Sequence, residues 1–549
     1  MSDWTKNGGI YFGHKINDPE TLHPSFSTLD LPWDILRDCY SYKSDRHIIT
    51  IGPNGSGKTR RLLVPNLHRL TDWSVLVVDP KGTLAVQTAK HRHDAGNRII
   101  TLDPFGVISA QHPGLVDRLP YLKSAGLNPL AALDPDGDEF PDDAKALAEA
   151  LIKIEGNEPH FSKSAQALVA GLIMALRVDK GINATLTDVR EHLGLDAKAL
   201  GICIKRSQKE IENDKKNGVE TEPGYIDLYG KQYPAIAAKL SRFANISPEN
   251  RELTGILSTA QTQTEWLDSA PVQRDLRQGV HDFGVMKSAP TTIYLILPPR
   301  YLETHGTWLR LIITAVLMPL IRTTGGRVPV LFMLDEFAQL GRMEVIERNM
   351  ALMREYGVKL WPIFQDLSQA KDLYKERWES FIGNAGITQS FAPQDETTRD
   401  YLSKLSGLRT YWLRTTGAST GQSVGPQHSE SSGTTSGWSH MQGPEYWGKG
   451  LARMEMGQAI MFNLGANFRT FLPDPEDAKW MPDTKRMLEA ARSMAGAAPA
   501  VHKPQPAGKA EIACPHCRQK VRVPGNRGSI EVKCPSSACG RKWVYDPAA

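Results

Sequence analysis

The chain has 549 residues, of which 40% are hydrophobic and 23% are charged. This length allows more than one domain, and the composition is in the ordinary range for a globular protein. The formal net charge of +4 does not by itself indicate a nucleic-acid binder, although acidic regions elsewhere would hide a basic groove in the total.

Residues 1–45 are expected to be an N-terminal segment without transmembrane helices. The first residues lack the basic and then apolar pattern of a secretory signal. No stretch satisfies the requirement of roughly 20 consecutive apolar residues for a membrane-spanning helix. The nearest candidate, 308–321, is too short, contains Arg310 and is interpreted as a buried core helix. We therefore expect a cytoplasmic protein.

Short apolar, β-rich runs alternate with helical patterns, which predicts an α/β fold with a parallel sheet. The expected strands are His47–Ile51, Ser74–Val78, 292–297, 328–334, 359–364 and 458–462. Residues 46–140 and 274–490 form the two parts of this α/β domain. Residues 141–273 show mostly helical patterns, so we expect an all-α domain inserted between the two parts.

A phosphate-binding motif follows the first strand. Its glycines let backbone N–H groups turn toward phosphate oxygens, and the helix that follows offers its positive end. Lys58 is expected to reach the β- and γ-phosphates and Thr59 to bind Mg²⁺. A chance glycine-rich turn is the alternative, which the strand and helix context disfavours. The motif residues are Gly52, Pro53, Asn54, Gly55, Ser56, Gly57, Lys58 and Thr59.

A second apolar run, 330–334, ends in Asp335 and Glu336. Such a run alone is often only a strand that meets a helix cap. Together with the phosphate-binding motif it predicts that Asp335 lies near Mg²⁺ and that Glu336 polarises the attacking water. An acid placed to activate water favours hydrolysis, so the sequence predicts an ATPase that uses ATP and Mg²⁺.

The last third of the chain contains two predicted linkers. Residues 415–443 are rich in Ser, Thr and Gly and have few aliphatic side chains with which to offset the entropy of ordering. Residues 491–509, rich in Ala and Pro, are interpreted as a semi-rigid tether. The tether separates the body from a small C-terminal module, 510–549.

That module is predicted to be a zinc ribbon. Four thiolates give Zn²⁺ a closed tetrahedral shell, and so small a module has too little core to fold without a metal. Disulfides are the alternative, which a cytosolic setting disfavours. Basic residues around the site are compatible with binding either nucleic acid or protein. The expected zinc ligands are Cys514, Cys517, Cys534 and Cys539.

Several blocks in this order resemble the TraG-like type IV secretion coupling proteins, the conjugative DNA-transfer ATPases. The blocks that follow the phosphate-binding motif are Val-Pro-Asn-Leu at 64–67, Val-Val-Asp-Pro-Lys-Gly at 77–82, Asn-Pro-Leu at 128–130, Tyr-Leu-Ile-Leu-Pro-Pro at 294–299, Leu-Asp-Glu-Phe at 334–337 and Leu-Gly at 340–341. The resemblance implies a RecA-like nucleotide-binding domain interrupted by an all-α domain that helps to recognise cargo. It also implies a hexamer with a central channel.

The resemblance further implies two site residues. Arg354 matches the arginine that reaches a neighbouring subunit's nucleotide, and Gln365 matches the glutamine that senses the γ-phosphate. A solvated surface arginine and a strand-end amide that satisfies a turn are the respective alternatives. A cation supplied by a neighbour would stabilise charge on the transferring phosphoryl group and couple hydrolysis to assembly.

The expected function is therefore an ATP-driven, DNA-stimulated coupling protein. It would pass a relaxosome-bound DNA strand, held single-stranded and without base readout, or effector proteins to type IV secretion channel components. The chain departs from the family by Thr83, where members often have Glu, and by lacking the usual transmembrane helices, so recruitment to the cytoplasmic face of the inner membrane would need another protein. The alternatives are a cytosolic DNA-translocating ATPase of the FtsK or HerA type and a recruitment adaptor that does not hydrolyse ATP.

Overall fold

In the computed structural model the chain forms two compact units, Met1–Met494 and Ala495–Ala549. The described residues are 9–16, 36–154, 159–206, 211–212, 216–217, 223–244, 250–322, 324–423, 429–463, 465–476, 482–495, 509–513, 517, 520–524, 530–533 and 542–545.

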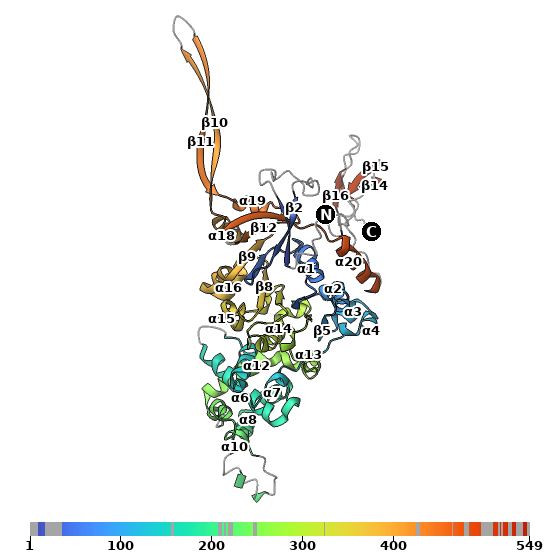
Figure 1. The fold of residues 1–549 in the computed structure, drawn as a ribbon, viewed down its shortest axis with the longest axis vertical. Helices are drawn as coiled ribbons and strands as arrows, with labels where there is room; N and C mark the ends of the chain where they lie inside the picture. Colours follow the sequence, from blue (N-terminus) through green and yellow to red (C-terminus); the bar gives the residue numbers. More distant parts are fainter. Residues whose placement is uncertain are drawn as a thin grey trace. The chain divides into compact units, whose positions relative to one another are not determined.

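An eleven-stranded mixed sheet forms the centre of the first unit (Figure 1). The strands of its parallel part are, in spatial order, β9 (Ala385–Ser390), β3 (His47–Ile51), β8 (Val358–Phe364), β7 (Val330–Leu334), β4 (Ser74–Val78), β6 (Thr291–Leu295) and β5 (Arg98–Leu102). All residues of β3, β4, β6, β7 and β8 are buried, as expected for apolar parallel strands covered on both faces.

Antiparallel strands continue the sheet beyond β9. They are, in order, β12 (Gln458–Asn463), β13 (Ala466–Phe471), β1 (Ile10–Ile16) and β2 (Leu36–Tyr42). The N-terminal strands, blue in Figure 1, thus lie beside strands from the C-terminal part of the unit, drawn in orange.

The six predicted strands are confirmed, β3 and β4 with the predicted bounds and the others shifted by one or two residues at an end. The prediction missed β1, β2, β5, β9 and β13. In β9 the reason is visible, because Thr388, Gln389 and Ser390 are polar yet buried. The Gln389 Oε1 accepts a hydrogen bond of 3.2 Å from the Thr50 hydroxyl of β3, so the strand lacks the apolar pattern on which the prediction depended.

Helices pack around the sheet. Those outside residues 140–276 are α1 (Val64–Arg69), α2 (Thr83–Asp94), α3 (Val107–Gln111), α4 (Leu115–Arg118), α14 (Pro299–Leu320), α15 (Glu344–Met353), α16 (Leu367–Tyr374), α17 (Trp378–Asn384), α18 (Glu396–Leu405), α19 (Gly448–Ala452) and α20 (Pro482–Ala495). The 3₁₀ turns are η3 (Pro120–Leu122), η4 (Pro129–Ala132), η5 (Gly181–Asn183), η6 (Ser241–Phe243), η7 (Glu265–Asp268), η8 (Gly284–Lys287), η9 (Phe337–Leu340) and η10 (Lys375–Arg377).

The chain from 140 to 276, between η4 and η8, contains a run of helices and, in its described part, no strand. These helices are α5 (Phe140–Leu151), α6 (Pro159–Lys180), α7 (Leu186–Leu193), α8 (Ala197–Ile204), α10 (Tyr225–Tyr229), α11 (Pro234–Leu240), α12 (Arg251–Thr264) and α13 (Ala270–Leu276). We call this run the helical segment. Its buried side chains, such as Leu168 and Ile256, belong to the same hydrophobic core as Ile293 and Phe332 of the sheet.

Two long apolar helices bear on the membrane prediction. Residues 308–321, predicted to be a core helix, fall largely within α14 and are mostly buried, which confirms that prediction. The prediction that no stretch is long and apolar enough to span a membrane is wrong by length and composition. The stretch Pro159–Asn183 qualifies by length and composition, although 72% of its apolar window is buried inside the protein, as in a core helix.

The predicted linker 415–443 is wrong for its described residues, because they form most of a long hairpin. Strand β10 (Leu408–Ser423) pairs with β11 (Ser429–Pro444) without a break in register, from Leu408↔Pro444 to Ser423↔Ser429. Buried apolar area, on which the linker prediction depended, is not the source of order here. Backbone hydrogen bonds between the strands order this segment, while Thr416, Gly417, Ser419 and the Ser, Thr and Gly residues of 432–439 stay exposed.

The second unit contains two small hairpins. One pairs β14 (Lys509–Ala513) with β15 (Lys520–Pro524), and the other pairs β16 (Ile530–Lys533) with β17 (Lys542–Tyr545). Of the four predicted zinc ligands, only Cys517 lies among the described residues, where it is exposed. Cys514, Cys534 and Cys539 lie outside them, and the described part of the chain contains no cluster of metal-ligand side chains.

Candidate nucleotide-binding site

The predicted phosphate loop connects β3 to a helix at the carboxyl edge of the parallel strands. Gly55 and Gly57 have φ values of 79° and 90°, a left-handed conformation that glycine adopts without steric cost. The chain then enters η2 (Lys58–Leu63), a π-helical turn that continues into α1. The loop therefore has the backbone shape in which several N–H groups can face one anion.

Lys58 is the buried cation of the loop. Its Nζ donates hydrogen bonds to the carbonyl oxygens of Gly52 and Pro53, the latter at 3.1 Å. Burial lowers the pKa of this ammonium, whereas the carboxylates of Asp335 and Glu336 raise it. The ammonium is thus held within the loop near two acids from another strand.

Those two acids follow β7, as predicted. Asp335 is 7% exposed, and burial, together with the neighbouring Glu336, raises its pKa to about 6. Glu336 adopts φ 54° and ψ 41°, a left-handed conformation that costs a side-chain-bearing residue about 1–2 kcal/mol. Strain of this kind is typical of functional sites. It sets the direction in which the Glu336 carboxylate leaves the end of the strand.

Gln365 lies directly after β8, the strand between β3 and β7. Its Nε2 donates a hydrogen bond of 2.7 Å to the Glu336 Oε2. The structure therefore brings the glutamine expected to sense the γ-phosphate into contact with the acid expected to activate water.

Asp79 joins this group, and the sequence analysis gave it no role of its own. The register Val78↔Leu334 places the ends of β4 and β7 side by side, so Asp79 and Asp335 leave the sheet at neighbouring positions. Asp79 is 3% exposed and accepts a 2.8 Å hydrogen bond from the Ala85 amide. Burial first, and then the charge of Asp335, raise its pKa to about 7. An Asp that directly follows a buried strand was the available signal.

Comparison with known proteins assigns the family. A sequence model described as type IV secretory system conjugative DNA transfer matches residues 14–436, which is more than half of the chain. The chain belongs to this family. It is 26% identical to the conjugal transfer protein TraG of Rhizobium radiobacter, over 68% of this chain and 54% of that protein. It is 28% identical to a TraG of Escherichia coli, over 67% and 56%. The chain thus spans about half the length of the curated relatives it matches.

Solved structures agree on the fold of this family member. The conjugative coupling protein TrwB, lacking an N-terminal segment, aligns with a TM-score of 0.52 and 12% identity, over 78% of this chain and 85% of that one. TrwB in complex with ADP and Mg²⁺ aligns with a TM-score of 0.51 and 13% identity. At this identity the likeness concerns the fold, an α/β architecture around a large mixed sheet.

Arg354 lies elsewhere in this family member. It is exposed, directly after α15 and before the amino end of β8. Gln365 follows the opposite end of this seven-residue strand, whose two ends are about 20 Å apart at about 3.3 Å per residue. Of the predicted catalytic residues, Arg354 alone is not brought to the phosphate loop of its own chain.

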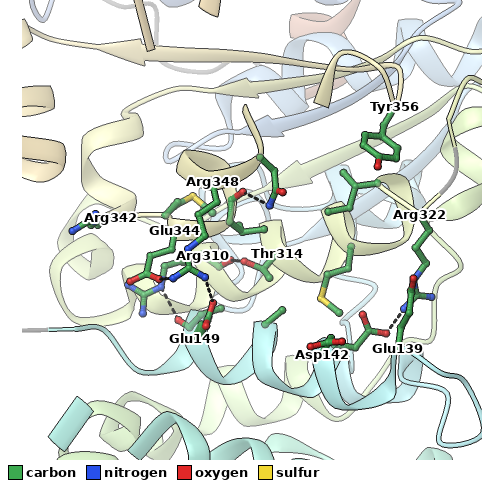
Figure 2. Close-up of a pocket in the computed structure, with 18 residues that line it drawn as sticks. Glu139, Asp142, Glu149, Arg310, Thr314, Arg322, Arg342, Glu344, Arg348 and Tyr356 are labelled. Carbon is green, nitrogen blue, oxygen red and sulfur yellow. Dashed lines mark hydrogen bonds and ion pairs between the residues drawn. The ribbon is translucent and has the colours of Figure 1, made fainter. Parts of the chain in front are cut away.

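A charged cavity of about 400 Å³ lies between α5, α14 and α15, away from the phosphate loop (Figure 2). Ion pairs cross it or line it. Arg348 of α15 contacts Glu149 of α5 at 3.3 Å, and Arg322, just after α14, contacts Glu139 at 2.7 Å. The first contact connects α5, at the start of the helical segment, to α15, the helix that ends just before Arg354, and the second connects the start of α5 to the end of α14.

The residues at the phosphate loop fit a magnesium-bound nucleoside triphosphate. The Thr59 hydroxyl and the Asp335 carboxylate are hard oxygen ligands of the kind that Mg²⁺ prefers. A Cβ built on Gly55 meets no atom within 4 Å, so the loop leaves room on this side. Lys58 supplies the matching positive charge.

Proposed function

We propose that this family member is an ATPase that drives DNA or protein substrates into a type IV secretion channel. The observation that carries the proposal is the convergence of Lys58, Asp335, Glu336 and Gln365 at one edge of the sheet. Lys58 would exchange its bonds with the Gly52 and Pro53 carbonyls for bonds to the β- and γ-phosphates. Mg²⁺, held by Thr59 and Asp335, would neutralise charge on the phosphates.

The acid after Asp335 would do the proton chemistry. Glu336 accepts a proton from a water whose oxygen bonds to the γ-phosphorus, while the bond to the β–γ bridging oxygen breaks and leaves ADP and phosphate. The Gln365 amide, bound to Glu336 at 2.7 Å, orients this carboxylate and would contact the γ-phosphate when nucleotide is present. The contact would report the phosphate's presence to β8.

The position of Arg354 supports action on a neighbouring subunit. At the amino end of β8 it is too far from its own phosphate loop, so its guanidinium would stabilise transferring phosphate only in an assembled ring, which we propose is a hexamer. Movement of α15 would then reach the helical segment through the Arg348–Glu149 ion pair. We propose that this all-α insertion is the part that receives cargo.

The relatives' names suggest the cargo and setting. Proteins named for conjugal transfer and plasmid coupling point to DNA, bound without sequence preference and as a single strand, and to a relaxase or effector protein delivered to channel components. We further propose that Cys514, Cys517, Cys534 and Cys539 hold Zn²⁺ and that the protein works at the cytoplasmic face of the inner membrane.

The first experiment measures ATP hydrolysis by the full chain with and without single-stranded DNA, over a range of protein concentrations. We expect turnover that rises with DNA and with protein concentration and that falls at least about 100-fold in Glu336→Gln. Glu303→Gln, an exposed acid outside the site, is the matched control. ATP binding without turnover under all these conditions would overturn the motor and favour a recruitment adaptor.

A mixing experiment tests Arg354. Arg354→Ala and Glu336→Gln should each be inactive alone. A mixture should regain activity, because an Arg354→Ala subunit keeps an intact site that a Glu336→Gln neighbour can supply with its arginine. Failure of the mixture to recover would contradict action between subunits while leaving the ATPase proposal standing.

A further inference from the structure

Among the described residues, the β10–β11 hairpin is an arm whose two strands pair with no other strand. Near the base, the Tyr411 hydroxyl donates to the Pro444 carbonyl at 2.6 Å, and the Tyr411 and Trp447 rings lie 6.3 Å apart. Beyond this point the strands pair only with each other (Figure 1). A two-stranded hairpin is at best marginally stable in water without a covered apolar face or a further strand.

Large apolar side chains are exposed on and around this arm. Trp412 is 66% exposed and Trp438 is 69% exposed. The pairs Trp412↔His440 and Arg414↔Trp438 place both tryptophans on one face of the arm as diagonal neighbours. Among the described residues, most of the exposed large hydrophobic side chains lie between 405 and 456: Leu405, Leu408, Trp412, Trp438, Met441, Trp447 and Met456.

Beyond Arg414 of β10, the arm has few of the features with which proteins keep exposed strand edges from pairing. Lysine, proline inside a strand and β-bulges are the usual protections. Neither strand contains a lysine, the only proline in either is Pro444 at the very end of β11, and the register is continuous. From 415 to 442 the only acid is Glu430, and there is no Lys or Arg. Unprotected edges of this length indicate that pairing with another strand is their use.

The chemistry favours a second copy of the chain as the partner. An arm that tracks nucleic acid would concentrate basic residues, and this one does not. Neutral Ser, Thr and Gly residues can meet the same residues of another copy without like-charge repulsion, and Thr–Thr and Thr–Ser pairs across strands are favourable. In a closed ring each arm can pair on both edges, which leaves no edge exposed.

We propose that the β10–β11 arms of neighbouring copies pair edge to edge with one another and bring their Trp412–Trp438 faces side by side. This inference goes beyond the ATPase proposal, since it assigns an assembly surface that neither ATP chemistry nor cargo requires. The pairing joins the arms side by side and so links subunits at a place far along the chain from Arg354.

The test uses charge at two exposed positions, one on each strand and diagonal to each other, so that neither faces the other directly within one arm. The variants of the full chain are Thr416→Lys/Thr434→Lys, Thr416→Glu/Thr434→Glu and the neutral control Thr416→Ser/Thr434→Ser. Sedimentation velocity over a concentration series, with and without a non-hydrolysable ATP analogue, measures self-association. Near-ultraviolet circular dichroism checks the folded state.

We expect each charged variant to associate at least about tenfold more weakly than wild type, because like charges meet between copies. An equal mixture of the Lys and Glu variants should recover, and the neutral control should match wild type. Unchanged association of the charged variants, loss without recovery in the mixture, or absence of self-association in the wild type would each overturn the proposal. ATP binding, measured separately on each variant, distinguishes these outcomes from failure of the ATPase proposal.

Discussion

Two turns with the sequence Asp-Pro-x-Gly follow two parallel strands of the same sheet. One follows β4 at 79–82 and the other follows β5 at 103–106. Gly82 and Gly106 are both left-handed, with φ values of 69° and 64°, and each glycine amide bonds the carbonyl of its Asp at 3.1 Å. In both turns the carboxylate accepts amide hydrogens from the helix that follows. The motif is thus first of all a device for starting a helix.

The neighbours of the turns differ. Strand β4 lies beside β7, so Asp79 faces Asp335 in the candidate site. Strand β5 is the last of the sheet, and Asp103 lies near Asp275, which accepts a 2.6 Å hydrogen bond from the Ser124 hydroxyl. Each turn therefore belongs to a pair of carboxylates, but only the first pair lies near Lys58. The order of the strands in the sheet, and not the Asp-Pro-x-Gly motif, therefore decides which aspartate lies in the candidate nucleotide site.

The largest expected effect is on turnover. Asp335→Asn should lower the rate of ATP hydrolysis at least about 100-fold, because the neutral amide carries no negative charge to balance that of Mg²⁺. Asp275→Asn, the equivalent change in the second pair, should leave turnover within about threefold once the folded fraction is equal. Steady-state hydrolysis with thermal denaturation of each variant tests this. Equal losses of ATP hydrolysis in Asp335→Asn and Asp275→Asn would contradict the assignment of only the first carboxylate pair to the nucleotide site.

The second effect is on the pH dependence of stability. Burial raises the pKa of Asp275 from 3.8 to about 6. Its folded form holds a proton that the unfolded chain releases, so this stabilisation is complete below about pH 4 and is lost as pH rises through about 6, amounting to at most about 3 kcal/mol. In Asp275→Asn, the urea concentration at the midpoint of unfolding should therefore vary less with pH between about 4 and 6. The pKa of Asp79, raised to about 7, should extend this loss of stability to higher pH.

Saturating ATP and Mg²⁺ separate the two pairs in the same measurement. Mg-ATP bound beside Asp79 and Asp335 favours their ionised forms, so the ligand should reduce the contribution of these two residues to the pH dependence of stability. The contribution of Asp275 should persist. Urea unfolding between pH 4.5 and 7.5, with and without ligand, gives both parts. A ligand effect that is undiminished in Asp335→Asn would contradict the assignment.

Much of the site was predictable because its residues follow strands that the sequence marks clearly. The phosphate loop follows β3 and Glu336 follows β7, and each strand is a short apolar run. The fold class followed from the same runs. Asp79 was not predicted as a partner of Asp335, because a sequence shows which residues end strands but not which strands lie side by side.

The hairpin β10–β11 and the interior strand β9 were not predicted for a different reason. Strand β9 buries polar residues, and β10 with β11 exposes Ser, Thr and Gly, so neither shows the pattern of a half-buried strand. These strands are held in place by backbone hydrogen bonds to other strands, which lie far along the chain for β9 and across a turn for β10 and β11. A hydrophobic pattern is silent about such pairing, which is why residues 415–443 were expected to be a linker.

The smallest expected effect lies at the third position of the two turns. Lys81 is exposed and its charge lowers the pKa of Asp335, whereas Phe105 stacks on Tyr301 with ring centroids 4.1 Å apart. Lys81→Met should raise the KM for Mg-ATP a few-fold, an effect that salt screens and Lys81→Arg avoids. Phe105→Leu should instead lower the free energy of unfolding by about 0.5–1.5 kcal/mol and leave KM unchanged. If Lys81→Met changed only stability, or Phe105→Leu changed KM, the two turns would not differ in the way their neighbours indicate.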